Sequence, residues 1–226
     1  MGRQLKQFWK FGSAKIILCQ NAWGNAEKMA KILPERNIFN ARVITGFIRP
    51  ELNKVDVTVH AQPVHLGSLF VEELKDLTPL SHAIDEGGLP CTVTQDIEKD
   101  LWAKMLYNCA LNGMGAILEV PYGFLGEKES TRKIMEGIVD EVFIVMKTLN
   151  YETHWRNSQE YLEEFYGKLL PNTYEHESSM LQDLRAGKTT EIEAINGVIV
   201  AEGIRSNIKV PFNFLIYNLI LFLQDK

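Results

Sequence analysis

The chain has 226 residues, of which 46% are hydrophobic and 23% charged, and its formal net charge is −5. This length and composition allow a sizeable core in one large domain or two small ones, and they argue against intrinsic disorder. Because no surplus of lysine and arginine is present to neutralise phosphates, nucleic acid is not an expected partner.

The first part of the sequence predicts a strand, a turn and a helix. The opening segment MGRQLKQFWKFGSAK is basic and lacks an apolar run, so it does not indicate a signal peptide. Residues 14–25, AKIILCQNAWGN, form an isoleucine-rich run ending in Asn and Gly, which is typical of a buried strand followed by a turn. Residues 26–33, AEKMAKIL, have helical spacing and stop at Pro34.

Strand patterns follow. Residues 41–52, ARVITGFIRPEL, and residues 55–70, VDVTVHAQPVHLGSLF, are rich in β-branched residues and contain stretches that alternate with a period of two. The alternation is clearest where three valines are separated by polar residues: Val55, Val57 and Val59. We therefore expect the second segment to form a half-exposed antiparallel strand.

Helical periodicity dominates the rest of the chain. Residues 71–88 predict one or two short helices, and residues 90–96 predict a brief strand or an extended linker. Beyond these, five segments show helical spacing with little strand signal: 96–118, 131–149, 158–170, 190–204 and 211–224. The chain therefore divides near residue 95 into a mixed α/β part, 1–95, and an all-helical part, 96–226.

The last helical segment, PFNFLIYNLILFLQ, is the most apolar of the chain. It is too short for a membrane span and is interrupted by Asn213 and Asn218, so no membrane partner is expected. A helix in the core or in an interface is the better interpretation. Its apolar surface exceeds what one core face needs, and we expect a homodimer contact there.

Three polar residues follow one another at helical spacing in LWAKMLYNCALN: Lys104, Asn108 and Asn112. Steps of four residues place them on one side of an α-helix. Asn is a poor residue for a helix interior, and a buried ammonium or amide costs free energy unless it has a partner. The line is therefore either a solvated stripe or one wall of a polar binding site.

The segment HESSMLQDLRAGKTTEIEAINGVI holds further candidates. Thr190 and Glu193 fit a capping box with Thr190 as the N-cap, which leaves Glu191 with no structural role beyond the helix dipole. Ser178 and Ser179 are hydroxyl donors for a carboxylate or hydroxyl ligand, or alternatively the cap of a helix that begins at Met180.

Asn21 ends the first predicted strand, at the edge where open α/β sheets bind ligands, although Asn is also a common turn residue. The sequence contains no HExxH, Walker lysine loop, GxSxG or GxGxxG motif. Its five histidines are scattered and its three cysteines form no CxxC pair, so no metal is expected. Cysteines that suggest no disulfide framework fit a reducing, cytoplasmic location.

The segments ILCQNAWGN, DLWAKMLYNCALN and SSMLQDLRAGKTTEIEAINGVIV together resemble ketopantoate reductase (2-dehydropantoate 2-reductase), in order and in separation. The resemblance covers the chain from about residue 14 onward. It implies an α+β chain: in 1–95 the last strands of a Rossmann-type NADP-binding domain, and in 96–226 an all-α substrate domain of the 6-phosphogluconate-dehydrogenase-like type. The implied activity is NADPH-dependent reduction of ketopantoate to pantoate, in pantothenate and CoA biosynthesis.

The resemblance also implies roles for six residues. Lys104 matches the family's catalytic lysine, which donates a proton to the substrate oxygen, and Glu191 matches the acidic residue near that lysine and near the nicotinamide ribose. The other four match substrate-binding residues, of which the first also touches the cofactor: Asn21, Asn108, Asn112 and Ser179. The chemistry is consistent, because an ammonium stabilises the oxygen that becomes an alkoxide when a carbonyl receives hydride.

The chain departs from the family pattern at three places. It has NAWG where the family has NG after the strand, and Tyr122 where the family often has a further substrate-binding Asn. The family's glycine-rich loop, which receives the cofactor pyrophosphate at a helix N-terminus, is not in this sequence. We therefore expect this chain alone to bind NADPH weakly and to turn over poorly.

Two other functions stay open. The helical part could be a non-catalytic module that binds a small acid or mediates dimerisation. Alternatively, the chain could belong to a reductase of another 2-keto acid.

Overall fold

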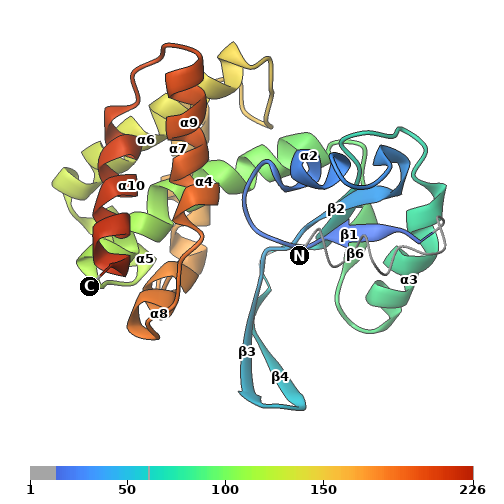
Figure 1. Cartoon of the computed structure of the whole chain (residues 1–226). Coiled ribbons are helices and arrows are strands. Elements are labelled where there is room, and N and C mark those ends of the chain that lie inside the picture. Colours follow the sequence, from blue (N-terminus) through green and yellow to red (C-terminus); the bar gives the residue numbers. More distant parts are fainter. Residues whose placement is uncertain (1–13, 61, 226) are drawn as a thin grey trace. The chain divides into compact units, whose positions relative to one another are not determined.

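The computed structural model describes residues 14–60 and 62–225 (Figure 1). Most of the opening segment MGRQLKQFWKFGSAK therefore lies outside the described residues. The chain forms two compact units. The first comprises residues up to Gln20 together with Gly24–Leu101, and the second comprises Asn21–Trp23 together with Trp102–Lys226.

The first unit contains a four-stranded sheet in the order β1-β2-β5-β6. Its strands are short: β1 Ile16–Leu18, β2 Ile38–Arg42, β5 Val64–Gly67 and β6 Cys91–Val93. β1 runs parallel to β2 and β5 runs parallel to β6, whereas β2 and β5 are antiparallel.

Both faces of this sheet are buried, which explains the apolar runs in its sequence. Ile38 belongs to one core cluster, with residues of helix α2 (Asn25–Ala30), and its neighbour Phe39 belongs to the other, in which Ile84 of helix α3 (Thr78–Glu86) packs. Successive strand residues point to opposite faces, so α2 covers one face and α3 the other. Two 3₁₀ turns precede β2 and α3: Glu35–Asn37 and Lys75–Leu77.

A separate antiparallel hairpin joins β2 to β5, made of β3 (Thr45–Glu51) and β4 (Lys54–His60). An antiparallel strand is confirmed for residues 54–60, but the predicted segment 55–70 also contains the separate, largely buried β5, and the predicted half-burial is wrong for β4. Val55 and Val57 expose 58% and 54% of their surfaces. The period-two pattern gave the strand, yet the hairpin pairs only with itself among the described residues, so no second layer covers these valines.

The second unit is built from helices, as predicted, and no strand follows Val93 in the described part of the chain. Its long helices are α4 (Ile97–Leu118), which begins in the first unit, and α6 (Glu129–Thr148). The shorter ones are α5 Tyr122–Glu127, α7 Ser158–Glu164, α8 Ser179–Arg185, α9 Asn196–Arg205 and α10 Pro211–Gln224. A π-turn, Phe165–Leu169, and two 3₁₀ turns, Pro171–Thr173 and Ile192–Ala194, complete it. The prediction of an α+β chain is confirmed.

The predicted capping box at Thr190 is wrong. α9 begins only at Asn196, because Ile195 has non-helical dihedral angles (φ −109°, ψ −99°) and the residues before it form a 3₁₀ turn. The Thr190 hydroxyl donates to Gln224 Oε1 at 2.5 Å and accepts from Ile192 N at 3.3 Å. At α8 the capping alternative is realised one residue earlier than expected: Ser178 is the N-cap, and its Oγ accepts from Leu181 N at 3.0 Å.

A buried polar network ties four helices of the second unit together. The Glu141 carboxylate on α6 accepts hydrogen bonds from the backbone N–H groups of Phe212 and Asn213, both at 2.8 Å, at the start of α10. The Asn213 side chain donates to Glu141 and accepts from Asn196 on α9, which also donates to the Cys109 carbonyl on α4. The network therefore fixes the backbone of α4 beside Asn108.

No helix in residues 14–60 and 62–225 is long and apolar enough to cross a membrane.

α4 lies close to α10 at Gly113. A Cβ added there would lie 2.3 Å from Ile216 Cγ2, a buried β-branched side chain with little room to move. Gly113→Ala is therefore expected to lower the free energy of unfolding by about 1–3 kcal/mol, as overpacking does. Denaturant unfolding measures this change.

Gly167→Ala is the matched control, because an added Cβ meets nothing within 4 Å there. It should leave stability unchanged or raise it slightly by restricting the unfolded chain. Equal stability of the two variants would contradict the close approach of α4 and α10.

Candidate functional site

Helix α4 presents the three polar residues along one line. Asn108 and Asn112 are 8% and 4% exposed, and Lys104 is partly buried. The line is therefore not a solvated stripe, which was the alternative interpretation of its spacing. Each of the three residues has a different hydrogen-bonding environment.

At one end of the line, Lys104 joins a hydrogen-bonded chain of three side chains. Its Nζ donates to Asn21 Oδ1 at 2.5 Å, and Asn21 Nδ2 donates to Glu191 Oε2 at 3.1 Å. An ammonium can only donate and a carboxylate can only accept, so the amide must turn its oxygen to Lys104 and its nitrogen to Glu191. The structure thus brings together three of the six predicted site residues.

The backbone around Asn21 is shaped to reach this position. Ala22 has φ +89° and Gly24 has φ +85°, so the chain turns through the left-handed region twice within three residues. Gly adopts this conformation without cost, whereas Ala does so only where the surroundings impose it. The short segment Asn21–Trp23 accordingly belongs to the second unit, although the residues on both sides of it belong to the first.

At the other end of the line, Asn112 is bound by Tyr122. The Tyr122 hydroxyl donates to Asn112 Oδ1 at 2.5 Å, and both residues are buried. Burial raises the pKa of Tyr122 well above its ordinary value, so the phenol keeps the proton that it donates. The Asn112 amide N–H₂ has no acceptor among the described residues, and it is left to donate to a ligand.

Between these two ends, the Asn108 side chain forms no hydrogen bond with another described side chain or backbone group, whereas its backbone belongs to the α4 ladder. Its amide oxygen and nitrogen are not among the solvent-excluded polar atoms that lack a partner, so they keep some contact with water. An amide in this position is open to a hydrogen bond from outside the chain. The chemistry of the line is therefore one ammonium and two amides, which suits a small, oxygen-rich acid.

His176 is a further residue beside this site, and its role was not predicted from the sequence. Its ring centroid lies 5.2 Å from that of Tyr122 in an edge-to-face arrangement, and its carbonyl accepts from Tyr122 N at 3.0 Å. Burial lowers the pKa of His176, so its ring is predominantly neutral at pH 7. In the sequence, only its position three residues before Ser179 could have indicated that it lies near the site.

Ser179 is less closely tied to the other candidates. It is the exposed first residue of α8, and no hydrogen bond joins it to the other five predicted site residues in the described part of the chain. The same described residues contain no group of three or more His, Cys, Asp or Glu side chains placed to hold a metal ion.

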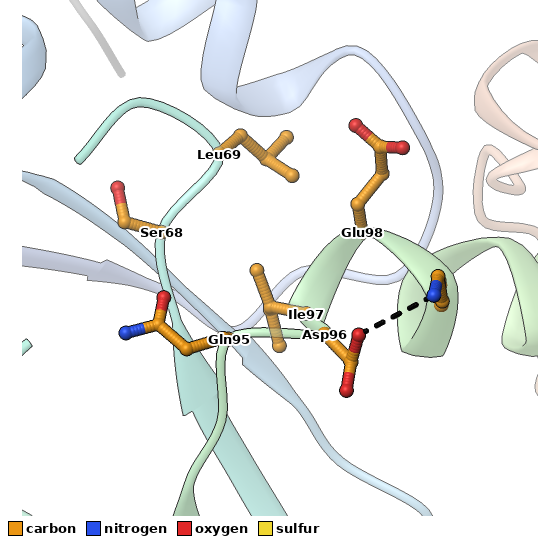
Figure 2. A pocket seen from close by; sticks show the side chains of 7 residues that line it. Ser68, Leu69, Gln95, Asp96, Ile97 and Glu98 are labelled. Atoms are coloured by element: carbon orange, nitrogen blue, oxygen red, sulfur yellow. Dashed lines mark ion pairs between the residues drawn. The ribbon is translucent and has the colours of Figure 1, made fainter. Parts of the chain in front are cut away.

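Figure 2 shows a hollow at a different place, in the first unit. It is lined by Ser68, Leu69 and residues 95–99, at the start of α4. The ion pair that the figure marks joins Lys99 Nζ to Asp96 Oδ1 at 3.6 Å. None of the six predicted site residues lines this hollow.

Comparisons with known proteins agree with the resemblance found in the sequence. The family profile described as "Ketopantoate reductase PanE/ApbA C terminal" matches residues 96–224. The 2-dehydropantoate 2-reductase of Aquifex aeolicus is 37% identical over 207 residues, which cover 91% of this chain but only 66% of that protein.

Two solved structures share the fold. A ternary structure of D-mandelate dehydrogenase with NADH and anilino(oxo)acetate aligns with a TM-score of 0.87 at 22% identity, covering 99% of this chain and 72% of that one. Dimeric ketopantoate reductase from Staphylococcus aureus aligns with a TM-score of 0.76 at 18% identity, covering 93% of this chain and 68% of that one. Because the family profile matches more than half of its residues, this chain belongs to the ketopantoate reductase family.

Proposed function

We propose that the chain acts in the NADPH-dependent reduction of 2-dehydropantoate to pantoate, a step of pantothenate biosynthesis, in the cytoplasm. The single observation that carries the proposal is the hydrogen-bonded chain Lys104–Asn21–Glu191, with Asn108 one turn along the same helix. The activity named for the Aquifex aeolicus relative supports it. In this proposal residues 96–226, together with Asn21, supply the substrate side of the site.

Reduction of a keto acid places negative charge on the keto oxygen. A nicotinamide cofactor, when bound, supplies the hydride. Lys104 is the group of this chain suited to that oxygen: its ammonium stabilises the developing charge, and a proton from Nζ completes the hydroxyl. Asn21 orients the ammonium through its amide oxygen, and the Glu191 carboxylate balances the charge beyond it.

The substrate is held by neutral donors in this proposal. Asn108 and the amide N–H₂ of Asn112 are available to the carboxylate and hydroxyl oxygens of the acid, with Ser179 as a further donor. Hydrogen bonds from amides to a carboxylate are charge-assisted and stronger than neutral pairs. These groups fix the orientation of the acid without adding a second positive charge beside Lys104.

The residues present fit only part of a nicotinamide cofactor. The Asn21 amide and the Glu191 carboxylate are donors and acceptors that suit ribose hydroxyls. For the pyrophosphate, the sequence offers no GxGxxG motif, and α2, with six residues, is too short to serve as a phosphate-binding helix. We therefore keep the expectation that this 226-residue chain binds NADPH weakly on its own.

The first test separates binding from turnover. Lys104→Ala should lower ketopantoate reduction by roughly 10²- to 10⁴-fold, the usual contribution of a general acid. Asn108→Ala should weaken pantoate binding by about tenfold or more, since it removes a hydrogen bond to a charged group. Calorimetry with pantoate and NADPH oxidation at saturating cofactor measure the two effects.

The controls are exposed residues of the same types in the same unit, Lys147→Ala and Asn172→Ala, which should change neither quantity. Failure of the wild-type chain to bind ketopantoate, pantoate or any other 2-keto acid would contradict the proposal. That outcome would favour a module without a retained acid site, such as a dimerisation module.

A reductase of another 2-keto acid is the second candidate, and Tyr122 is the observation that favours it. Its buried ring occupies the position where the resemblance implies a polar contact. The ring centroid lies 5.8 Å from that of Tyr107 and 5.2 Å from that of His176. An aromatic wall of this kind changes the shape and polarity that the site offers to the acid's side chain.

Tyr122→Phe tests how far this wall governs recognition. The change keeps the ring and removes the donor to Asn112, so pantoate binding is expected to weaken about two- to tenfold, the net value of one hydrogen bond. Calorimetry with a panel of 2-hydroxy acids measures it. Unaltered affinity and ranking across the panel would show that Tyr122 has no part in recognition.

We also propose that the chain forms a homodimer through α10. Phe214 and Leu215 expose 53% and 52% of their surfaces on this helix, and Leu219 adds to the same apolar patch. Patches of this kind mark protein interfaces. The Staphylococcus aureus relative is described as dimeric.

The double variant Phe214→Ser with Leu215→Ser should shift the chain from dimer to monomer, because it removes apolar area that only association buries. Light scattering after size exclusion measures the mass. Leu52→Ser, at an 87% exposed site in the first unit, is the control and should leave the mass unchanged. A monomeric wild-type chain would end this proposal.

A further inference from the structure

Trp23 packs against two other aromatic rings of the second unit. Its ring centroid lies 4.6 Å from that of Trp102 and 4.9 Å from that of Tyr151, and the latter two are 5.3 Å apart. Trp102 is fully buried and Trp23 nearly so. Each ring thus contacts the other two in the tilted and edge-to-face arrangements that aromatic side chains prefer.

Trp23 contacts the two elements that carry Lys104 and Glu191, the partners of Asn21 in the hydrogen-bonded chain. Trp102 lies on α4, two residues before Lys104. The backbone N–H of Trp23 donates to the Ala194 carbonyl at 3.4 Å, in the 3₁₀ turn whose N-cap is Glu191. Trp23 therefore contacts both α4, which carries Lys104, and the 3₁₀ turn that follows Glu191. Asn21 is only two residues before Trp23 in the sequence.

The backbone between Asn21 and Trp23 needs such an anchor. Ala22 is held at φ +89°, which an alanine adopts only where its surroundings impose it. The two hydrogen bonds of the Asn21 side chain are only partly buried, and the net contribution of such bonds to stability is modest. Packing of three large rings is the contact that a water molecule cannot replace.

We infer that Trp23 is a positioning residue, which holds the Asn21 amide between Lys104 and Glu191. The hydrogen-bonded chain Lys104–Asn21–Glu191 consequently lies within the second unit alone. The catalytic consequence of this inference rests on the proposed function; the placement of Asn21 does not.

The experiment compares Trp23→Ala with Trp23→Phe and with Trp155→Ala. Trp155 is a matched control: a partly buried tryptophan of the same unit that packs on Tyr161 at 4.8 Å, away from the six candidate residues. Each variant is labelled with an amine-reactive reagent, and the rate at Lys104 is followed by mass spectrometry. Thermal unfolding is recorded alongside.

Trp23→Ala is expected to raise the labelling rate at Lys104 about two- to tenfold, the range that loss of one hydrogen bond covers. Trp23→Phe keeps a ring against Trp102 and should restore the rate toward wild type. Trp155→Ala should lower the melting temperature and leave the rate unchanged. Asn21→Ala should raise the rate as Trp23→Ala does, and the double variant should raise it no further, because both changes break the same contact.

An unchanged rate in Trp23→Ala, or an equal change in Trp155→Ala, would overturn the inference. Labelling requires no keto acid, so the outcome is independent of the proposed function. Calorimetry with pantoate on the same variants reports on that function separately. If the variants that label faster also bind pantoate more weakly, the positioning role of Trp23 is connected to substrate binding.

Discussion

The carboxylate of Glu141 is the constraint on which the helical unit depends. The first backbone N–H groups of a helix have no partner within the helix, and at α10 two of them, those of Phe212 and Asn213, would be left without acceptors in a largely buried place. One side chain on α6 accepts both, and its negative charge also complements the positive end of the α10 dipole. Removal of this group would leave several buried donors unsatisfied at once.

This constraint reaches the candidate site through one direct path. Asn213 accepts from Asn196, and Asn196 donates to the carbonyl of Cys109, the residue after Asn108 on α4. Asn196 also starts α9 shortly after the 3₁₀ turn that Glu191 caps. The wall that carries Asn108 and the loop that carries Glu191 are therefore joined to the same buried network, which limits how far they can move apart.

The sequence predicted what depends on local spacing. The α4 line follows from steps of four residues, and the strand that leads to Asn21 follows from an apolar run that ends in Asn and Gly. It did not predict what depends on contacts distant in sequence. Glu141 looked like any acidic residue on a helix, because its partners lie about seventy residues away.

The wrong predictions have the same physical origin. Thr190 fitted a capping motif, and its Oγ1 does accept from Ile192 N, but its hydroxyl donates to Gln224 near the end of the described chain, and the residues after it form a 3₁₀ turn instead of the helix. Val55 and Val57 fitted a strand with one buried face, but the pattern cannot say whether another layer exists to bury them. In the sequence Trp23 was only a departure from a family motif, because its packing partners, two aromatic rings, come from segments distant in the chain.

The two polar chains of the helical unit obey one rule. In each, an asparagine lies next to a carboxylate, so the amide must turn its nitrogen toward the acid and its oxygen the other way. In the core that oxygen, on Asn213, meets the amide of Asn196, and a structural link results. Beside α4 the corresponding oxygen, on Asn21, meets an ammonium. A fixed amide dipole then orients the lysine Nζ, and orientation of that kind is what a proton donor needs and a structural link does not.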